Sequence, residues 1–396
     1  MASLLEPGSH RAADVVDDGA LVSAMLRVEV AWLHALAACG AATAEQVTAV
    51  EKAAASLEPR IAPRDVEDAG NPALPLVRAL RAAVTDPDAA ALVHRGLTSQ
   101  DLVDTALMLM VRAALDRLTV DLDAACDSLA SLADTHRDSV MAGRTLTQHA
   151  VPVTFGLKTA HWLVGVLDAR AGLLEARTAL PVQCGGAAGT LALAAGLVDD
   201  PVRAASAFAD QLGLVWPGLP WHSRRTPVTR LGDLFAETTG ALARIASDVL
   251  LLGRPEFAEV REAAHAGRGG SSTMPQKQNP MLSVLVRSAG LQAPQLAAQL
   301  HLCAANGVDE RPPGEWQAEW PALRRLLELA LTSAAQAAEL VENLQIDAYA
   351  MRHRAETEAS TLLAEASVEG RDPMSYLGAA NTFIDAAIQR WRVIRG

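Results

Sequence analysis

Hydrophobic positions repeat with the period of an α-helix along most of the chain. Residues 19–39 place apolar side chains at helical spacing on one face: Leu21, Met25, Val28, Trp32 and Leu36. Two stretches, 97–142 and 322–369, contain neither glycine nor proline over 46 and 48 residues. A helix over the first stretch would approach ~60 Å at about 1.5 Å per residue.

Three further segments carry the same pattern, which makes five long helical candidates. They are residues 153–180, 232–253 and 281–306. Helices this long and apolar need partners on several faces, so we expect an all-α fold built on a long central helical bundle. Short strands could occur in turns, but no run of alternating β-branched residues requires a sheet.

Breaks in the pattern predict three domains. Residues 1–96 would form an N-terminal helical domain, since prolines and glycines interrupt their second half. Residues 97–340 would form the long-helix bundle, and residues 341–396 a short C-terminal helical domain. The last domain breaks at "EGRDP" and resumes as one closing helix.

Composition and charge argue against a nucleic-acid-binding, membrane-bound, secreted or metal-binding protein. A net charge of −12 over 396 residues argues against nucleic acid as the main partner. We find no apolar run long enough to span a bilayer and no secretory start, so we expect a cytoplasmic protein without a membrane partner. The four cysteines are widely spaced and the ten histidines are scattered, which predicts no metal site, disulfide framework or cofactor.

The first of three polar segments, "HRGLTSQD", begins the first long helix. Thr98 or Ser99 can cap that helix, and Thr98 with Asp101 resembles a capping box. The segment could also bind a substrate carboxylate, through the N–H groups at the helix start, the two hydroxyls and Arg95. The sequence alone leaves a structural cap and an anion site open.

The second polar segment, "GRTLTQHAVPVTFG", lies between two long helices. It is either an ordinary connection or a group of substrate ligands. Its donors exceed what a connection of this length needs: Arg144, Thr145, Thr147, Gln148 and His149.

The third polar segment, "GRGGSSTMPQKQNP", spans residues 267–280. A flexible linker is the plain interpretation, but linkers rarely mix glycine and serine with methionine, proline and lysine. Glycines beside a serine allow backbone N–H groups to converge on an anion. Lys277, one of only three lysines in the chain, adds a positive charge.

This third segment resembles the signature of the fumarase/aspartase superfamily of lyases, G-S-x-x-M-x-x-K-x-N. The matching residues are Gly270, Ser271, Met274, Lys277 and Asn279. The other two segments fall where that superfamily has its two further motifs. Within it, "HRGLTSQDLVDTALML", "PVQCGGAAGTLAL" and "VDERPPGEWQAEW" resemble the bacterial 3-carboxy-cis,cis-muconate cycloisomerases.

The resemblance implies an internal addition in which one substrate carboxylate attacks a diene carbon and closes a lactone. Ser271 would be the acid, Lys277 and Asn279 would hold the doubly charged aci-carboxylate, and His149 would complete the catalytic set. The remaining substrate contacts would come from Arg95, Thr98, Ser99, Arg144, Thr147, Gln148, Met274 and Arg311. We expect Arg95, Arg144, Arg268, Lys277 and Arg311 to balance a tricarboxylate substrate.

The resemblance also implies a homotetramer whose active sites combine motifs from three subunits. The family histidine that follows Arg-Thr in adenylosuccinate lyase is replaced here by Leu146, with His149 beyond it. That difference weighs against an adenylosuccinate-type, fumarate-releasing lyase, which remains the alternative. A helical scaffold without catalysis is a third hypothesis. The C-terminal domain is shorter than we expect for relatives. The shortening concerns the part of the chain whose groups would cover the active site.

Overall fold

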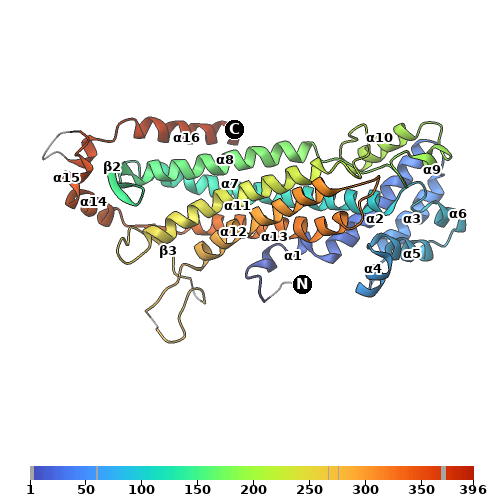
Figure 1. Cartoon of the computed structure of the whole chain (residues 1–396), viewed down its shortest axis with the longest axis horizontal. Helices are drawn as coiled ribbons and strands as arrows, with labels where there is room; N and C mark the ends of the chain where they lie inside the picture. The colour runs from blue at the N-terminus through green and yellow to red at the C-terminus, as the bar shows by residue number, and fades with distance from the viewer. Residues whose placement is uncertain (1–3, 59–60, 266, 275, 367–371) are drawn as a thin grey trace. The chain divides into compact units, whose positions relative to one another are not determined.

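The long helices predicted from the sequence are present in a computed structural model of the chain (Figure 1). The structure describes all residues except 1–3, 59–60, 266, 275 and 367–371. Five helices of 24 or more residues lie in the five long segments: α7 (Ser99–Thr135), α8 (Phe155–Thr178), α11 (Thr226–Leu252), α12 (Met281–Asn306) and α13 (Glu315–Glu342). The predominantly helical fold class is therefore confirmed.

The backbone packs into two compact units, each assembled from three stretches of the chain. The first unit contains Met1–Asp116, Leu173–Asp233 and Pro294–Glu328. The second unit contains Arg117–Gly172, Leu234–Ala293 and Leu329–Gly396. Each unit is described by itself below. The three domains drawn from the sequence stay a prediction.

The first unit adds short helices to its portions of the long ones. They are η1 (Ser9–Arg11), α1 (Ala13–Val16), α2 (Asp18–Ala38), α3 (Ala44–Ser56), α4 (Pro63–Ala69), α5 (Ala73–Ala83), α6 (Pro87–Leu92), α9 (Ala192–Ala195) and α10 (Pro201–Leu212). Helix α2 covers the segment whose periodicity predicted it, and Asp17 caps its first turn by accepting from the Ala20 N–H at 2.8 Å. Trp32 of α2 is fully buried and meets Phe208 of α10 edge to face.

Helix α2 corrects one expectation from the sequence. Among the described residues, it is long and apolar enough to cross a membrane by length and composition, although we expected no such run. More than half of its apolar window is buried inside the protein, and Glu29 and Trp32 both make hydrogen bonds there. The core helix of a soluble protein passes the same test, because a buried helix also needs apolar faces.

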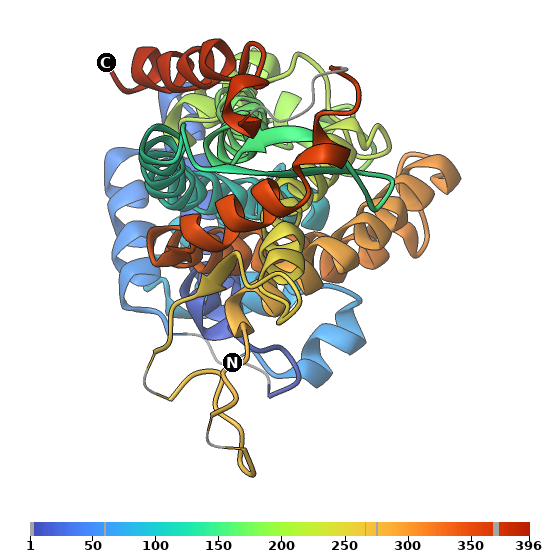
Figure 2. The ribbon, with the colours of Figure 1, turned by 90° about the vertical axis from the view of Figure 1, so that its left-hand side faces the viewer.

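The second unit contains two small antiparallel sheets and the C-terminal helices. The strands are β1 (Val140–Thr145), β2 (Gln148–Thr154), β3 (Val260–Glu262) and β4 (Leu344–Ile346). The C-terminal elements are α14 (Ala348–Thr357), α15 (Ala359–Leu362), η2 (Pro373–Ser375) and α16 (Ala380–Arg395). The stretch between α12 and β3 projects as a long loop from this unit (Figure 2).

The helix that we expected to continue to Ala142 ends at Thr135, so that expectation was wrong. Residues 140–154 instead form the β1–β2 hairpin, with Val140 opposite Thr154 and Thr145 opposite Gln148. The register shifts at Gly143, where a Cβ would lie 2.4 Å from the Val151 carbonyl oxygen. Likewise, the second glycine-free stretch is not one helix, because α13 ends at Glu342 and β4 follows.

Candidate active site

The residues predicted to form the site are divided between the two compact units. Arg95, Thr98, Ser99 and Arg311 belong to the first unit. The second unit holds Arg144, Thr147, Gln148, His149, Ser271, Met274, Lys277 and Asn279. Within each unit, the structure brings some of these residues together through contacts that the sequence did not reveal.

In the first unit, Thr98 immediately precedes α7 and takes part in two contacts. Its backbone N–H donates to Asp101 Oδ2 at 2.9 Å, which is the backward bond of the predicted capping box. Its hydroxyl lies 2.6 Å from Arg311 Nη2 and accepts a hydrogen bond from it. The structure therefore places Arg311 beside Thr98 although 213 residues separate them in the sequence. Ser99 opens the helix at the same point.

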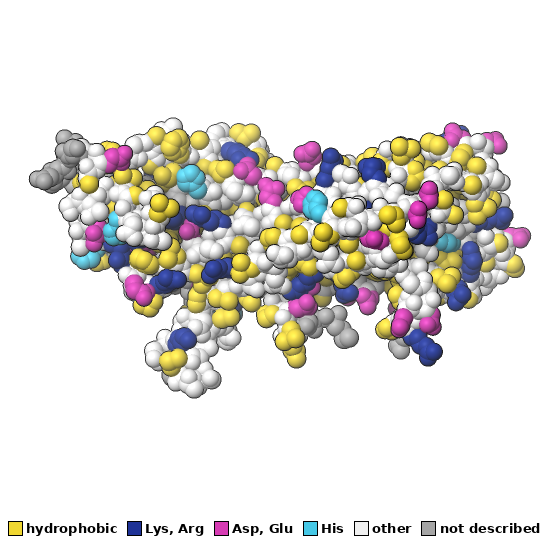
Figure 3. All heavy atoms as spheres, in the orientation of Figure 1, with side chains coloured by type: hydrophobic (Ala, Val, Ile, Leu, Met, Phe, Trp, Pro, Cys, Tyr) yellow, Lys and Arg dark blue, Asp and Glu magenta, His cyan; other side chains and the backbone are white. Residues whose placement is uncertain are grey.

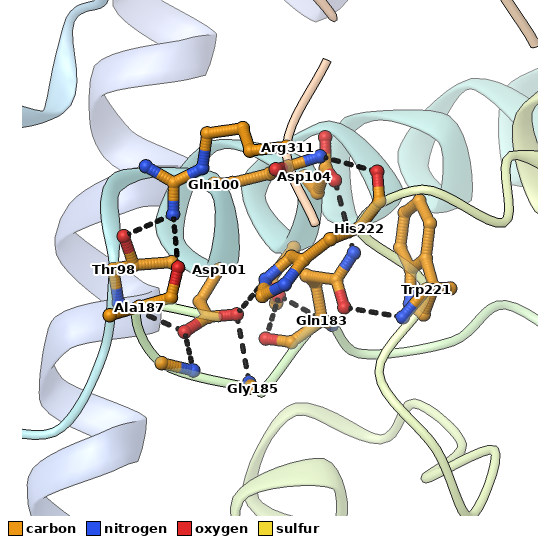
Figure 4. Close-up of polar contacts among 12 residues, drawn as sticks. Thr98, Gln100, Asp101, Asp104, Gln183, Gly185, Ala187, Trp221, His222 and Arg311 are labelled. Atoms are coloured by element: carbon orange, nitrogen blue, oxygen red, sulfur yellow. Dashed lines mark hydrogen bonds and ion pairs between the residues drawn. The ribbon is translucent and has the colours of Figure 1, made fainter. Parts of the chain in front are cut away.

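Asp101 connects the start of α7 to two other segments (Figure 4). Its carboxylate accepts from the N–H groups of Gly185 at 2.9 Å and Gly186 at 2.8 Å. Its Oδ1 also lies 2.7 Å from Nε2 of His222, and both side chains are buried. Together with the Thr98 bond, these contacts supply a buried carboxylate with four donors, so the helix start is fixed rigidly.

Arg311 retains hydrogen-bonding capacity at this position. Nη2 makes a longer contact of 3.4 Å to the Ala187 carbonyl, and Nε is buried with no protein partner in the described part of the chain. First-turn N–H groups of a long helix and a guanidinium both favour an anion. The group formed by Thr98, Ser99 and Arg311 is therefore chemically suited to a carboxylate.

Helix α2 holds the loop that leads into this group. Glu29 accepts from the His94 N–H at 2.8 Å, and its other oxygen lies 2.6 Å from His94 Nδ1. Burial on its own lowers the pKa of His94, but the adjacent Glu29 carboxylate outweighs it and the pKa is raised. Trp32 donates to the carbonyl of Arg95 at 2.8 Å, while the Arg95 residue itself is exposed.

A buried ion cluster lies beneath the same helix. Arg225 donates to Asp104 at 2.7 and 3.1 Å and to Glu319 at 2.6 to 3.1 Å, and Trp316 donates to Asp104 at 3.0 Å. Burial alone lowers the pKa of Arg225, but the two carboxylates raise it overall, so the guanidinium stays charged. The cluster joins α7 and α13 to Arg225, the residue immediately before α11, within the first unit.

We expect Arg225→Met to destabilise the protein by roughly 3–5 kcal/mol, because it leaves two buried carboxylates without their cation. Chemical unfolding followed by circular dichroism measures the change. Arg224→Met is the matched control, since Arg224 is the exposed neighbour. Equal stability of the two variants would contradict a structural role for the cluster.

In the second unit, the β1–β2 hairpin presents the middle group of predicted residues. Leu146 and Thr147 form its two-residue turn with φ of 50° and 69°. Positive φ at both positions is the geometry of a type I′ turn, which favours glycine and asparagine. Leucine and threonine are therefore strained here. Thr147 and Gln148 are exposed at the tip, and Leu146 is 96% exposed.

Arg144 and His149 are cross-strand partners on that hairpin. Arg144 donates to Glu259 at 3.1 and 3.4 Å, and its guanidinium lies 4.5 Å from the centre of the Phe257 ring. His149 Nδ1 lies 3.5 Å from a carboxylate oxygen of Glu358. Both predicted ligands are thus held by carboxylates of their own chain.

That arrangement differs from the cation cluster expected from the sequence. Arg144 is paired with Glu259, and Arg268 is paired with Glu339 at 2.5 Å. Two of the five cations therefore already have carboxylate partners, because burying a guanidinium near protein carboxylates satisfies its charge locally.

The signature loop closes on itself at its base. Asn279 donates to the Gly269 carbonyl from its backbone at 2.8 Å and from its side chain at 2.9 Å. A Cβ on Gly269 would lie 2.3 Å from the Asn279 carbonyl oxygen, and φ there is +73°. Only glycine fits this position. Asn279 therefore has a structural contact, and its contact with substrate stays a prediction.

Ser271 and Lys277 lie on the projecting part of that loop. Ser271 Oγ accepts from the Met274 N–H at 3.1 Å, and Lys277 donates its backbone N–H to the Met274 carbonyl at 3.0 Å. Met274 and Lys277 are exposed, and the loop surface is mostly uncharged in Figure 3. Pro275 lies outside the described residues. In the described ranges, no cluster of three His, Cys, Asp or Glu side chains could hold a metal.

Comparison with known proteins shows the family of the chain. A family model described as lyase matches residues 14–294. A 3-carboxy-cis,cis-muconate cycloisomerase of Bradyrhizobium diazoefficiens is 39% identical over 98% of this chain and 86% of its own length. The chain belongs to the fumarase/aspartase superfamily of lyases.

Further members of the superfamily are similar over most of the chain. A nitrosuccinate lyase of Streptomyces davaonensis is 45% identical over 88% of this chain and 76% of its own length. The crystal structure of 3-carboxy-cis,cis-muconate lactonizing enzyme from Pseudomonas putida has a TM-score of 0.86 and 31% identity, covering 97% of each chain. These similarities identify the chain as an enzyme with the helical fold of that superfamily.

Several residues around the site were not identified from the sequence. His222, Glu259 and Arg354 are each buried or paired beside a predicted residue. The segment "PWHSRR" gave one available signal, since a histidine follows a tryptophan in a short connection between helices. Glu259 and Arg354 gave none, because only folding brings them next to Arg144.

Proposed function

We propose that this enzyme closes 3-carboxy-cis,cis-muconate to its lactone, the 3-carboxy-cis,cis-muconate cycloisomerase reaction of protocatechuate catabolism. The observation that carries the proposal is the similarity to the Bradyrhizobium cycloisomerase, which is 39% identical over 98% of this chain. Three further curated relatives with that name are 34–40% identical over 89–93% of this chain. The intact signature from Gly270 to Asn279 supplies the residues that the chemistry needs.

In the proposed reaction, one substrate carboxylate forms a carbon–oxygen bond to a diene carbon. The displaced electron pair moves through the double bond onto a second carboxylate, which becomes an aci-carboxylate. Ser271 then gives its proton to the adjacent carbon, and Lys277 stabilises both the serine oxyanion and the aci-carboxylate. Thr98, Ser99 and Arg311 would bind a remaining carboxylate, with His149 beside the reacting group.

A nitrosuccinate lyase reaction is the second candidate, because the Streptomyces relative of that name is 45% identical. Elimination from nitrosuccinate would break a carbon–nitrogen bond, release nitrite and leave fumarate. The same serine would then act as base and remove the proton next to a carboxylate. The catalytic loop serves both reactions, so the distinction lies in the groups that surround the substrate.

One assay separates the candidates. The protein is mixed with 3-carboxymuconate, and loss of diene absorbance is followed. Parallel reactions measure nitrite from nitrosuccinate and fumarate from adenylosuccinate. Turnover of 3-carboxymuconate alone supports the proposal, and nitrite release alone would replace it with the second candidate. Fumarate from adenylosuccinate would favour the purine-type lyase, and no activity would favour a non-catalytic scaffold.

We further propose a cytoplasmic homotetramer whose sites combine residues from three subunits. Among the described residues, the side chains of Ser271 and Lys277 make no hydrogen bond or ion pair to another segment. Thr147 and Gln148 are exposed at the hairpin tip. Within the second unit, helix α12 also exposes Val284 and Leu291, which lie seven residues apart on one side of the helix. A second copy of the chain would cover such an apolar stripe.

Shared sites predict that two inactive variants restore each other. Ser271→Ala and His149→Ala are each inactive in this scheme. In a symmetric tetramer mixed at random, each site takes Ser271 from one subunit and His149 from another, so about one quarter of the sites would have both residues intact. The measurement is activity after mixing and reassembly, with each variant reassembled alone as control. Absence of recovery, when mass spectrometry shows that subunits have exchanged, would contradict shared sites.

A further inference from the structure

Two residues at the end of α14 support the β1–β2 hairpin with matching spacing, Arg354 through Glu259 and the C-cap residue Glu358 by direct contact. Arg354 Nε donates to Glu259 Oε1 at 3.1 Å, and the same oxygen accepts from Arg144 Nη2 at 3.1 Å. One turn later, Glu358 lies 3.5 Å from His149. The Glu358 N–H donates to the Arg354 carbonyl at 3.0 Å, so the last helical turn fixes their spacing.

On the hairpin side, the spacing is equally fixed. Arg144 and His149 stand directly opposite each other across the two strands. Residues one helical turn apart are therefore matched to a cross-strand pair, so each contact favours the geometry of the other. Arg144 and His149 are also the two hairpin residues that the sequence assigned to substrate.

The contact between Arg354 and Arg144 is built around the buried carboxylate of Glu259. Glu259 is fully buried, and two guanidiniums share it. The Phe257 ring lies within 4.5 Å of the Arg144 guanidinium and 5.4 Å of the Arg354 guanidinium. A buried carboxylate needs such partners, so Arg354 fixes Glu259, and Glu259 in turn fixes Arg144.

Apolar packing adds to these polar contacts. Val140 and Ala142 of β1 form one buried cluster with Ala355 of α14 and Leu362 of α15. The side of α14–α15 that carries Arg354 and Glu358 is thus packed on the hairpin. By contrast, Arg352 and Glu356 of the same helix pair with each other at 2.8 Å and are about half exposed.

The strained turn between β1 and β2 needs support from packing of this kind. Leu146 and Thr147 hold left-handed backbone angles that cost free energy outside glycine. Such angles persist only where surrounding contacts over-determine them. The two strands that flank the turn are held by α14 and α15 through Arg144, His149 and the apolar cluster.

We propose that the α14–α15 junction is a clamp that holds the hairpin in its active geometry, with Arg354 and Glu358 as positioning residues. Part of this proposal, the effect on turnover, rests on the proposed function. Glu358 lies 3.5 Å from Nδ1 of His149 and restrains the ring at that nitrogen, so Nε2 is the nitrogen left to meet substrate. Arg354 acts through Glu259 and keeps Arg144 in place.

The first test measures amide hydrogen exchange of residues 140–154 in the full-length protein. Arg354→Met is expected to speed exchange in the hairpin at least tenfold and to leave α16 unchanged. Arg352→Met, on the same helix but paired away from the hairpin, is the matched control. Equal exchange in both variants would overturn the clamp. Should Arg354→Met fail to fold, Glu358→Ala decides the same point, since the Glu358 side chain is 38% exposed and its removal leaves no buried charge unpaired.

The second test measures kcat and KM on the substrate that the wild type turns over. Glu358→Ala is expected to lower kcat by about 10²-fold with little change in KM, as expected for misplacement of a catalytic group. Glu358→Gln, which keeps an acceptor oxygen, should recover most of that loss, and Glu356→Ala should have no effect. Equal kcat in Glu358→Ala and Glu356→Ala would overturn the positioning role.

The exchange test can fail or succeed independently of the proposed function, whereas the kinetic test needs a substrate. Wild-type protein that turns over neither 3-carboxymuconate nor nitrosuccinate would overturn the proposed function. The exchange measurement would still accept or reject the clamp, because it needs no substrate.

Discussion

Replacing Ser271 with alanine should leave a folded protein that binds substrate and turns it over roughly 10²–10⁴-fold more slowly, the usual contribution of a positioned acid or base. In the proposed reaction, Ser271 transfers the proton that completes the addition. Alanine cannot do this, while the glycines and the Asn279 closure of the loop remain. The loss should therefore fall on kcat, with KM changed much less.

Steady-state kinetics on Ser271→Ala test this expectation, with equilibrium binding of substrate to the variant measured separately. Ser272→Ala is the matched control, because Ser272 is the exposed neighbour on the same loop. Near-normal turnover in Ser271→Ala would remove the serine from the mechanism. A similar loss in both variants would indicate a loop defect rather than missing proton transfer.

The second large effect is expected from Lys277→Met. Loss of one preorganised charge that stabilises a developing oxyanion typically raises the barrier by about 2.7–4 kcal/mol, a factor of roughly 10²–10³ in rate. The reaction accumulates negative charge on a carboxylate that is already ionised, and the loop is otherwise mostly uncharged. We therefore expect Lys277→Met to retain at most about 1% of the wild-type rate.

Circular dichroism should show unchanged helix content in Lys277→Met, because Lys277 is exposed and only its backbone N–H is bonded inside the loop. Lys52→Met is the matched control, since Lys52 is an exposed lysine on α3. Retained activity in Lys277→Met would exclude the lysine from catalysis. Loss of helix content would assign the effect to folding instead.

The helical periodicity predicted the long helices because a repeat of apolar residues every three or four positions is a local property. The backward bond of the predicted Thr98–Asp101 capping box is present for the same reason, since its two residues lie within one turn. The hairpin was missed because Val140, Met141 and Ala142 also continue a helical pattern. Their pairing with Pro152, Val153 and Thr154 becomes visible only once the strands meet.

The candidate site also combines features that are local in the sequence with contacts that only folding creates. Sequence alone determined the signature loop, because Gly270, Ser271, Met274, Lys277 and Asn279 lie within ten residues and their spacing is read directly. It also determined the membership of the superfamily and the helical fold that follows from it.

Tertiary structure alone decided which side chains support those residues. Arg311 meets Thr98 across 213 residues, and Glu259 meets Arg144 across 115. Charge is a property of a residue, but a charge partner is a property of the fold, because a buried guanidinium pairs with whichever carboxylate packing brings within reach. For that reason, two of the cations that we expected to bind the substrate are already paired with carboxylates of the protein. Arg144 is paired with Glu259, and Arg268 with Glu339.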